Sequence, residues 1–360
     1  MAEPRLRTAL DGIPSYKAGQ RPPEHPGRRS YKLSSNENHH EPLPEILAAI
    51  EAALPQIHRY PDYASTALVD AIAVRFDVPA EQVAVGTGSV GMLQQLFQVT
   101  CGPGDGVVFG WRSFEAYPIM AQIVGATAQR VDLDADDRHD LDAMARAIDE
   151  TTRLVLVCNP NNPTGTAVDE EQLAGFIERV PSDVLIVLDE AYCEFVDPDR
   201  VPDGLRWQRQ HGNVAVLRTF SKAHGLAALR VGFCIASEPV ADALRKVQVP
   251  FGVSTLAQAA GIAALHNEGA LMERVHAIRE QRDVLDARLR DLGLHPAQSQ
   301  ANFLWLRLGQ QSGAFAAACQ EAGLSVRPFE GEGVRITIGE PEANAALLEV
   351  AAAWLAADSR

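Results

Sequence analysis

Short apolar, β-branched runs separated by helical segments dominate the 360-residue sequence from about residue 43 to residue 240. Several of these runs are apolar at every position, whereas a strand with one exposed face would alternate apolar and polar residues. Continuous apolar strands are typical of a sheet that helices cover on both faces. The sequence therefore predicts an α/β domain. Its runs are QVAVG (82–86), GVVFG (106–110), RLVLVC (153–158), VLIVLD (184–189), VAVLR (214–218) and VGFCIA (231–236).

The sequence changes character on either side of this domain. Residues 1–30 hold five prolines among glycines and charged residues, which indicates an extended arm. After about residue 240, the amphipathic segment LMERVHAIREQRDVLDARLRDLG precedes two alternating strands, NFLWLRL and GVRITIG. The length also exceeds the size at which a single core stops growing. We expect an arm over 1–30, a large domain over 31–245 and a smaller α+β domain over 246–360.

Charge and composition argue against several classes of protein. The formal net charge of -15 and the isoelectric point near 5.1 disfavour binding to nucleic acid or to anionic membranes. The sequence has neither an apolar run long enough to cross a bilayer nor a signal sequence, so a cytoplasmic protein is expected. The five cysteines are widely spaced and the ten histidines form no H-x-x-x-H pair, so we expect neither disulfides nor a metal site.

The first strand end that could bind a ligand carries GTGSVG, which satisfies G-x-G-x-x-G. Ligands of open α/β sheets bind beyond the carboxyl ends of the strands. A dinucleotide site would also need an acidic residue at the end of the next strand, where this chain has Trp111 and Arg112. The backbone amides of Gly88, Ser89 and Val90 could still bind a phosphate at a helix N-terminus. A tight turn that needs glycine is the alternative.

Two further strand ends carry polar residues. VCNPNNPTG places Asn159, Asn161 and Asn162 after a strand, although a rigid turn would also explain this motif. LIVLDEAYCEF places Asp189 and Glu190 at another strand end, as in the acidic motif of an ATPase. The ATPase interpretation fails because the chain contains no G-x-x-x-x-G-K-[ST] sequence. Asp189 therefore needs a different cation as its partner.

A fourth strand end carries one of the four lysines of the chain. The segment RTFSKAHGLAALR places Lys222 where a buried strand gives way to a helix, next to Ser221 and two helical turns before Arg230. Ser221 and Arg230 could hold a phosphate, and the Lys222 amine is suited to forming an imine with a carbonyl. Phosphate seats, an acidic residue that needs a ring cation and an imine-forming lysine together describe pyridoxal 5'-phosphate (PLP).

With these residues in order, the chain resembles a fold-type-I PLP-dependent aminotransferase of the histidinol-phosphate aminotransferase group, and within it the actinobacterial aromatic (phenylalanine) branch. The resemblance covers about residues 5–355. It implies a large domain with a mixed, mostly parallel sheet between helices, a smaller α+β C-terminal domain, an N-terminal arm and a homodimer with shared active sites. It rests on LSSNEN, HRYPD, GTGSV, FGWRSFEAYP, VCNPNNPTG, LDEAYCEF, RTFSKAHGLAALRVGF, SQANFLWL and VRPFEGEGVRITIG.

The resemblance assigns roles to residues at matching positions. Lys222 would bind PLP as a Schiff base and carry the proton between the substrate Cα and the cofactor. Asp189 would pair with the pyridinium nitrogen and keep it protonated, so that the ring can accept electrons. Asn162 and Tyr192 would contact the ring hydroxyl, and Phe114 would stack on the ring. The predicted catalytic residues are Lys222, Asp189 and Tyr192.

The remaining assignments concern the PLP phosphate and the substrate. Tyr60 would reach the phosphate from the other subunit, and Tyr16 in the arm could cover the site. The substrate's anionic group would be bound by Arg335 together with Arg327, Asn36 and Asn162. The residues expected around the phosphate are Gly88, Ser89, Val90, Thr219, Ser221 and Arg230.

Some positions depart from the family pattern or have simpler explanations. His39 and His40 stand where the family usually has proline and glycine, so the start of that loop is not predicted. His224 replaces the commoner tyrosine of KAYGLAGLR without altering a predicted catalytic role. Three assigned residues have plainer alternatives, namely a surface ion pair for Arg327, core packing for Phe114 and a buried hydroxyl for Tyr192.

The substrate is predicted from the resemblance, because Arg335 could bind either a carboxylate or a phosphate. The motifs GWRSFEAYP and VRPFEGEGVRITIG favour transamination of phenylalanine, tyrosine or tryptophan with 2-oxoglutarate by a Lys222 Schiff-base ping-pong mechanism. Trp111, Phe114 and Phe329 would be neighbours of the substrate ring. Histidinol phosphate is the alternative donor. PLP decarboxylases and carbon-sulfur lyases remain open, because they use the same lysine and aspartate.

Overall fold

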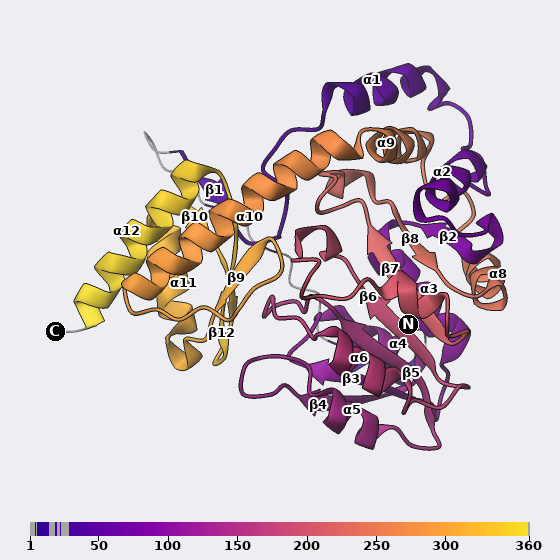
Figure 1. Cartoon of the computed structure of the whole chain (residues 1–360), viewed down its shortest axis with the longest axis horizontal. Coiled ribbons are helices and arrows are strands. Elements are labelled where there is room, and N and C mark those ends of the chain that lie inside the picture. Colours follow the sequence, from indigo (N-terminus) through magenta and orange to yellow (C-terminus); the bar gives the residue numbers. More distant parts are fainter. Residues whose placement is uncertain (1–3, 5, 14–18, 20–21, 23–28, 359–360) are drawn as a thin grey trace.

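The computed structural model describes residues 4, 6–13, 19, 22 and 29–358. A large lobe surrounds a seven-stranded sheet, and a small lobe contains the C-terminal helix (Figure 1). Helix α10 (Glu268–Asp291) runs from one lobe to the other. Of the predicted arm, the described part includes a 3₁₀ turn at Thr8–Leu10, whereas Tyr16 lies outside the described residues.

The large sheet has the strand order β2-β8-β7-β6-β5-β3-β4. Strand β8 is antiparallel to both of its neighbours and the other pairs are parallel, so the sheet is mixed and mostly parallel, as predicted. The strands are β2 (Val83–Gly86), β3 (Gly106–Trp111), β4 (Thr127–Asp132), β5 (Thr152–Cys158), β6 (Leu185–Asp189), β7 (Val214–Thr219) and β8 (Gly232–Ile235).

The apolar runs form strands because alternate residues of each run enter two different cores. In β5, Val155 and Val157 join the core on one face of the sheet, whereas Leu154 and Leu156 join the core on the other. The first face is covered by α1 (Pro44–Ala53), α2 (Thr66–Phe76), α5 (Leu141–Ala147), α6 (Glu170–Ile177), α7 (Gly204–Gln208) and α9 (Thr255–His266). The second face is covered by α3 (Gly88–Thr100), α4 (Ala116–Val124) and α8 (Glu238–Val247).

Strand β4 has no counterpart among the predicted runs. Its sequence, TAQRVD, is half-buried or exposed throughout, and it lies at the edge of the sheet beside β3 alone. An edge strand has only one neighbour to pair with and can present polar side chains to water. Strand β4 therefore lacks the continuous apolar sequence by which the other six strands were predicted.

The small lobe is built on an antiparallel sheet of the order β11-β12-β9. A parallel pair between β1 and β10 joins residues 31–32 to this lobe. The core of the large lobe in turn continues into α9 and to Leu271 in α10. The domain boundaries at residues 30 and 245 stay a prediction. The elements of the small lobe are β1 (Tyr31–Lys32), β9 (Phe303–Leu306), α11 (Ser312–Glu321), β10 (Leu324–Ser325), β11 (Arg327–Phe329), β12 (Gly333–Thr337) and α12 (Pro341–Asp358).

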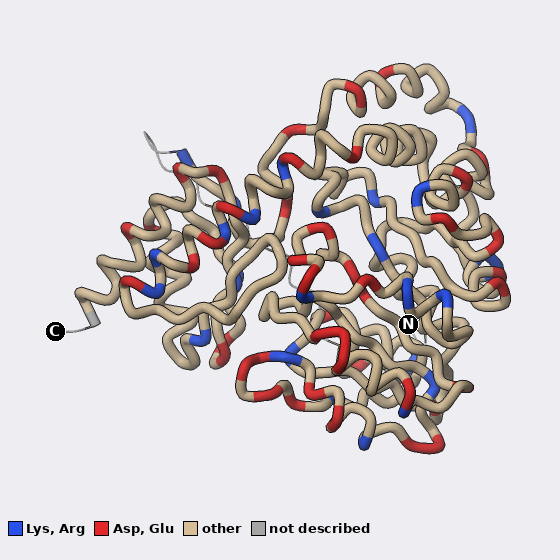
Figure 2. Tube along the Cα trace, viewed as in Figure 1, with Lys and Arg blue, Asp and Glu red and all other residues tan. Residues whose placement is uncertain are grey.

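Acidic and basic residues are interspersed along both lobes (Figure 2). Among the residues that the structure describes, no helix has both the length and the apolar composition to span a bilayer. Within the same residues, no group of three or more His, Cys, Asp or Glu side chains could hold a metal ion. The five cysteines are free, and Cys158, Cys234 and Cys319 are buried.

Candidate active site

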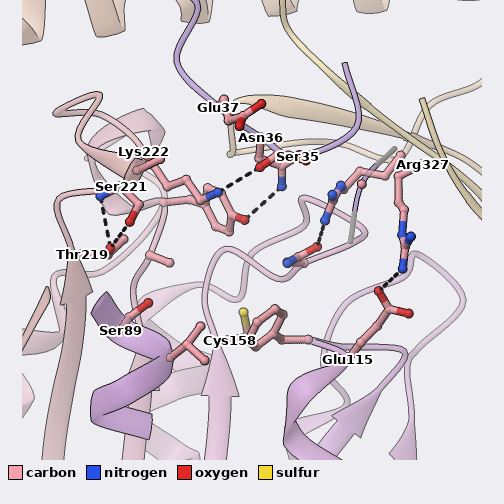
Figure 3. A pocket seen from close by; sticks show the side chains of 18 of the residues that line it. Ser35, Asn36, Glu37, Ser89, Glu115, Cys158, Thr219, Ser221, Lys222 and Arg327 are labelled. Atoms are coloured by element: carbon pink, nitrogen blue, oxygen red, sulfur yellow. Dashed lines mark hydrogen bonds and ion pairs between the residues drawn. The ribbon is translucent and has the colours of Figure 1, made fainter. Parts of the chain in front are cut away.

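A cavity lies beyond the carboxyl ends of β6 and β7, beside the N-terminus of α3 and against the hairpin β11-β12 of the small lobe (Figure 3). Residues that are far apart in the sequence therefore meet at one place. The predicted site residues that line this cavity are Asn36, Ser89, Val90, Phe114, Asn162, Asp189, Tyr192, Thr219, Ser221, Lys222, Arg230, Arg327 and Arg335.

Lys222 lies in the turn after β7, and its side chain points into the cavity (Figure 3). Its Nζ donates a hydrogen bond to the backbone carbonyl of Ser35 at 3.1 Å and lies 5.8 Å from the centre of the Tyr192 ring. Burial, aided by the positive charge of Arg335, lowers the pKa of Lys222 to about 7. The neutral amine is therefore well populated near neutral pH and can attack a carbonyl carbon.

Asp189 is the last residue of β6 and is almost fully buried. Its Oδ2 accepts a hydrogen bond from the Tyr117 hydroxyl at 2.7 Å, whereas its buried Oδ1 has no hydrogen-bond partner within the described chain. Burial raises the pKa of Asp189 to about 6, although the Tyr117 hydrogen bond opposes this shift. A buried carboxylate oxygen without a donor is a site for a ligand N–H, and the pyridinium nitrogen of PLP would supply one.

The turn after β7 and the start of α3 form an anion seat. Thr219 Oγ1 donates to Ser221 Oγ at 2.9 Å, and Ser221 Oγ also accepts from Arg230 Nη1 at 3.2 Å. Gly88 has a positive φ of 76° at the first residue of α3, and a Cβ there would collide with the Arg230 guanidinium. The thirteen-residue helix α3 begins beside these residues, and Ser89 and Val90 in its first turn line the same cavity. Backbone amides, hydroxyls and a guanidinium at a helix N-terminus fit a phosphate group.

The other end of the cavity holds a network that joins the two lobes. Arg335, on β12, donates to Asn162 Oδ1 at 2.5 Å and to the Ser34 carbonyl at 2.7 Å. Asn36 donates from Nδ2 to the Tyr192 hydroxyl at 2.9 Å (Figure 3). Burial raises the pKa of Tyr192, so its hydroxyl stays neutral and can donate to a ligand oxygen. These contacts pre-position the residues predicted for the substrate's anionic group and for the ring hydroxyl.

Two aromatic rings that were predicted as ring neighbours line the cavity, and a third does not. Phe114 lines it and meets the Tyr117 ring edge-on at 5.6 Å, and Phe329 lines it from β11. Trp111 does not line the cavity. The guanidinium groups of Arg112 and Arg130 each lie 4.5 Å from its ring centre. The prediction that Trp111 contacts the substrate ring is therefore not supported by its position.

Two predicted residues within the described part of the chain do not line the cavity of their own chain. Gly88 lacks a side chain and so leaves the space that the Arg230 guanidinium occupies. Tyr60 is 82% exposed and stacks on Phe251 at 4.6 Å between ring centres. Tyr16 is outside the described residues.

Sequence reasoning missed several residues of the site. Tyr117 belongs to the motif FGWRSFEAYP, but nothing in that motif indicates its hydrogen bond to Asp189. Glu115, from the same motif, lines the cavity and forms an ion pair with Arg327. Ser35, whose carbonyl accepts from Lys222, carries no local signal of this contact, because it lies 187 residues away in the sequence.

The histidines that depart from the family pattern lie outside the cavity. The rings of His39 and His40 are 4.2 Å apart, and His224 packs on Phe220 at 4.9 Å. Burial lowers the pKa of His224 to about 4, so it is neutral at physiological pH. His224 does not line the cavity, and the expectation that this change leaves the predicted catalytic roles intact stays a prediction.

Glu190, the acidic neighbour of Asp189, has a structural role. Its Oε2 accepts from Arg218 Nε at 2.9 Å and from Arg218 Nη2 at 2.7 Å, and its Oε1 accepts from the Gly204 amide at 2.7 Å. Both side chains of this ion pair are buried. The two adjacent acids thus point to different environments, as expected for consecutive residues at a strand end.

Comparisons with known proteins agree with this geometry. A sequence model of the family "Aminotransferase class I and II" matches residues 29–351. The chain is 56% identical over 347 residues to an aromatic amino acid aminotransferase of Streptomyces avermitilis, and 57% identical over 348 residues to one of Streptomyces coelicolor. Each comparison covers 96% of this chain and 96% of the relative.

A solved structure of histidinol-phosphate aminotransferase from Sinorhizobium meliloti in complex with pyridoxal-5'-phosphate is similar along the whole chain. The TM-score is 0.88 at 27% sequence identity, with 99% of each chain covered. The protein therefore has the two-lobed α/β architecture of the fold-type-I enzymes. It belongs to the aminotransferase class I and II family.

Proposed function

We propose that the protein uses PLP to transfer the amino group of aromatic amino acids, namely phenylalanine, tyrosine and tryptophan, to 2-oxoglutarate. The observation that carries the chemistry is the pairing of a partly neutral Lys222 amine with the buried, half-unsatisfied Asp189 carboxylate in one cavity. The aromatic substrate class is supported by relatives of that name at 56% and 57% identity.

The residues of the cavity fit PLP group by group. The seat formed by α3, Ser221 and Arg230 would hold the phosphate, Asp189 Oδ1 would accept the ring N–H, and Phe114 would cover the ring. When bound, PLP supplies an aldehyde for an amine and a ring that accepts the electrons of the substrate Cα–H bond.

The chain's own residues then bind the donor and move its proton. Arg335 would bind the donor's carboxylate with its guanidinium fork, where Asn162 already orients it. Lys222 Nζ, released from its contact with Ser35, would take the proton from the substrate Cα and then deliver it to C4' of the cofactor. Asp189 would stay ionised beside the protonated ring nitrogen. The Tyr117 hydroxyl would hold the Asp189 carboxylate in place, and the Tyr192 hydroxyl would stay fixed by its hydrogen bond from Asn36.

Transamination of histidinol phosphate is the second candidate. It is supported by the similarity to the Sinorhizobium meliloti enzyme, at 27% identity, and by the chemistry of Arg335, which suits a phosphate as well as a carboxylate. The higher identity to the aromatic amino acid aminotransferases favours the first candidate.

We also propose a cytoplasmic homodimer in which Tyr60 serves the partner's cavity. Tyr60, Tyr63 and Phe251 form an exposed aromatic group, with ring centres 4.6 and 5.8 Å from that of Phe251. This group lies close to the start of α3, since a Cβ at Gly252 would be 3.1 Å from Thr87 Cγ2. An exposed aromatic cluster is typical of a protein-protein interface.

The test is an assay of glutamate formation by the purified, PLP-loaded protein with 2-oxoglutarate. Phenylalanine and histidinol phosphate are offered separately, and kcat/KM is measured for each. The proposal predicts a much higher kcat/KM for phenylalanine. A higher value for histidinol phosphate would establish the second candidate instead. Glutamate from neither donor, with carbon dioxide or sulfide released from other amino acids, would assign the protein to another PLP reaction.

A further inference from the structure

Two arginines face the cavity from adjacent strands of the small lobe. Arg327 on β11 is directly opposite Arg335 on β12 in the antiparallel ladder. Residues opposite each other point to the same face, with their Cβ atoms about 5 Å apart, and like charges there repel. Both side chains line the cavity. This pair therefore forms a cationic end of the cavity. Hydrogen-bond acceptors or negative charges nearby have to offset the repulsion between the two guanidinium groups.

The structure compensates the two arginines differently. Arg327 Nη2 donates to Glu115 Oε2 at 2.9 Å, and these side chains are 11% and 31% exposed (Figure 3). Arg335 donates to the amide oxygen of Asn162 and the carbonyl oxygen of Ser34, which are neutral acceptors. Glu115 itself also lines the cavity.

We propose that Glu115 determines which donors the enzyme accepts by placing a negative charge beside the two arginines that face the donor's anionic group. This inference rests on the proposed aminotransferase function and names the residue that sets its substrate class. An amino acid's carboxylate carries one charge, whereas a phosphate monoester carries about 1.5 to 2 at pH 7. A phosphate bound between the arginines would meet the Glu115 carboxylate and compete with it for Arg327. Glu115 therefore disfavours phosphate-bearing donors by repulsion rather than by shape.

The Glu115 ion pair also joins the two lobes, so a purely structural role has to be separated from charge selection. The chain offers a matched control three residues away. Arg112 forms an ion pair with Glu332, which lies in the turn between β11 and β12. This second pair joins the same two segments, but Glu332 and Arg112 do not line the cavity. Breaking it loosens the same contact without changing the charge inside the site.

The test measures the binding of two ligands of similar shape and different charge to the PLP-loaded protein by titration calorimetry at pH 8. The ligands are 3-phenylpropanoate, a monoanion, and 2-phenylethyl phosphate, a dianion. We expect Glu115→Gln to shift the ratio of the two affinities toward the phosphate by about tenfold relative to wild type. Glu332→Gln should leave that ratio within about twofold. Arg327→Gln, which leaves the Glu115 carboxylate without its cation, should shift the ratio the other way.

An unchanged ratio in Glu115→Gln, or an equal shift in Glu332→Gln, would overturn the inference. If Glu115→Gln does not fold, as judged by circular dichroism, the direction of the shift in Arg327→Gln decides the matter alone. Failure of the proposed function would look different. It would appear in the wild-type donor assay, where histidinol phosphate would exceed phenylalanine, whereas failure of the Glu115 inference leaves that assay as predicted.

Discussion

The charged Asp189 side chain lowers the stability of the cofactor-free protein but is suited to binding a ligand. Its carboxylate is buried at the end of β6, and only one of its oxygens has a donor within the described residues. Burial raises its pKa from 3.8 to about 6, so the folded protein without cofactor is destabilised whenever this group is charged. A ligand that presents an N–H to the unpaired oxygen removes the penalty. The residue is therefore suited to binding a protonated ring nitrogen.

The first prediction is that Asp189→Asn stabilises the cofactor-free protein in a pH-dependent way. Because the folded-state pKa is raised, the penalty on the charged group is complete above about pH 6 and disappears as the pH falls through 3.8. Asparagine does not titrate and can keep the Tyr117 hydrogen bond. The free energy of unfolding, measured by urea denaturation at pH 7.5, should rise by up to about 3 kcal/mol, with a smaller gain at pH 4.5.

Glu190→Gln is the matched control, because Glu190 is adjacent but paired with buried Arg218. Removing this carboxylate weakens the pairing of a buried guanidinium, so the variant should be destabilised by about 3 kcal/mol at pH 7.5. A gain in Asp189→Asn that is the same at both pH values would contradict the proposed cause. Asp189→Asn should also lose aminotransferase activity, although it is the more stable protein.

Among the helices and strands, those whose sequence pattern is local could be predicted from the sequence. The six apolar runs are strands of the large sheet, and a run buried on both faces can be recognised from its continuous apolar sequence. Asp189 ends one of these strands, and the turn with Lys222 follows another. Strand β4 was missed because its edge position leaves a polar, half-exposed sequence. Strand β1 has only two residues and pairs with β10 almost 300 positions later, so no local pattern could indicate it.

The difference between local patterns and long-range contacts also decides which site residues could be predicted. Lys222, Asp189 and the start of α3 could be predicted because each lies at or just after the end of its own strand. The contact between Glu115 and Arg327 spans 212 positions and depends on how the hairpin β11-β12 lies against the large lobe. Tyr117 was missed although it is near in sequence to Phe114, because its partner Asp189 is 72 positions away. Pairings that arise from the docking of two lobes require the three-dimensional structure.

At the scale of the whole molecule, the cavity is shared between two lobes, and we propose that two subunits complete it. The exposed Tyr60 and Phe251 stack on each other near the start of α3, where the proposed phosphate seat lies. Tyr60 does not line the cavity of its own chain. An aromatic side chain that is exposed beside one anion seat can reach the equivalent seat of a two-fold related copy.

This arrangement predicts complementation between two defective variants. Lys222→Ala and Tyr60→Phe subunits carrying different affinity tags are co-expressed, and the hybrid dimer is purified. One of its two sites then combines an intact Lys222 with an intact Tyr60 from the partner. At limiting PLP the hybrid should therefore recover about half of the wild-type activity per dimer, because one of two equivalent sites is complete.

The two parent homodimers are the controls. Lys222→Ala should be inactive, and Tyr60→Phe should be active only at high PLP concentrations. If Tyr60 served its own chain, the site with the intact Lys222 would also carry the Tyr60→Phe substitution. The hybrid would then reach only half of the low activity of the Tyr60→Phe homodimer, which would refute shared active sites.

The proposed chemistry requires the Lys222 amine to react with the aldehyde of PLP. The most direct measurement is borohydride reduction of the PLP-loaded protein, followed by proteolysis and mass spectrometry of the peptides. We predict a phosphopyridoxyl group on Lys222 and on none of Lys17, Lys32 and Lys246, the other lysines of the chain. An unmodified Lys222 peptide after reduction of the coloured, cofactor-loaded protein would show that Lys222 does not bind PLP.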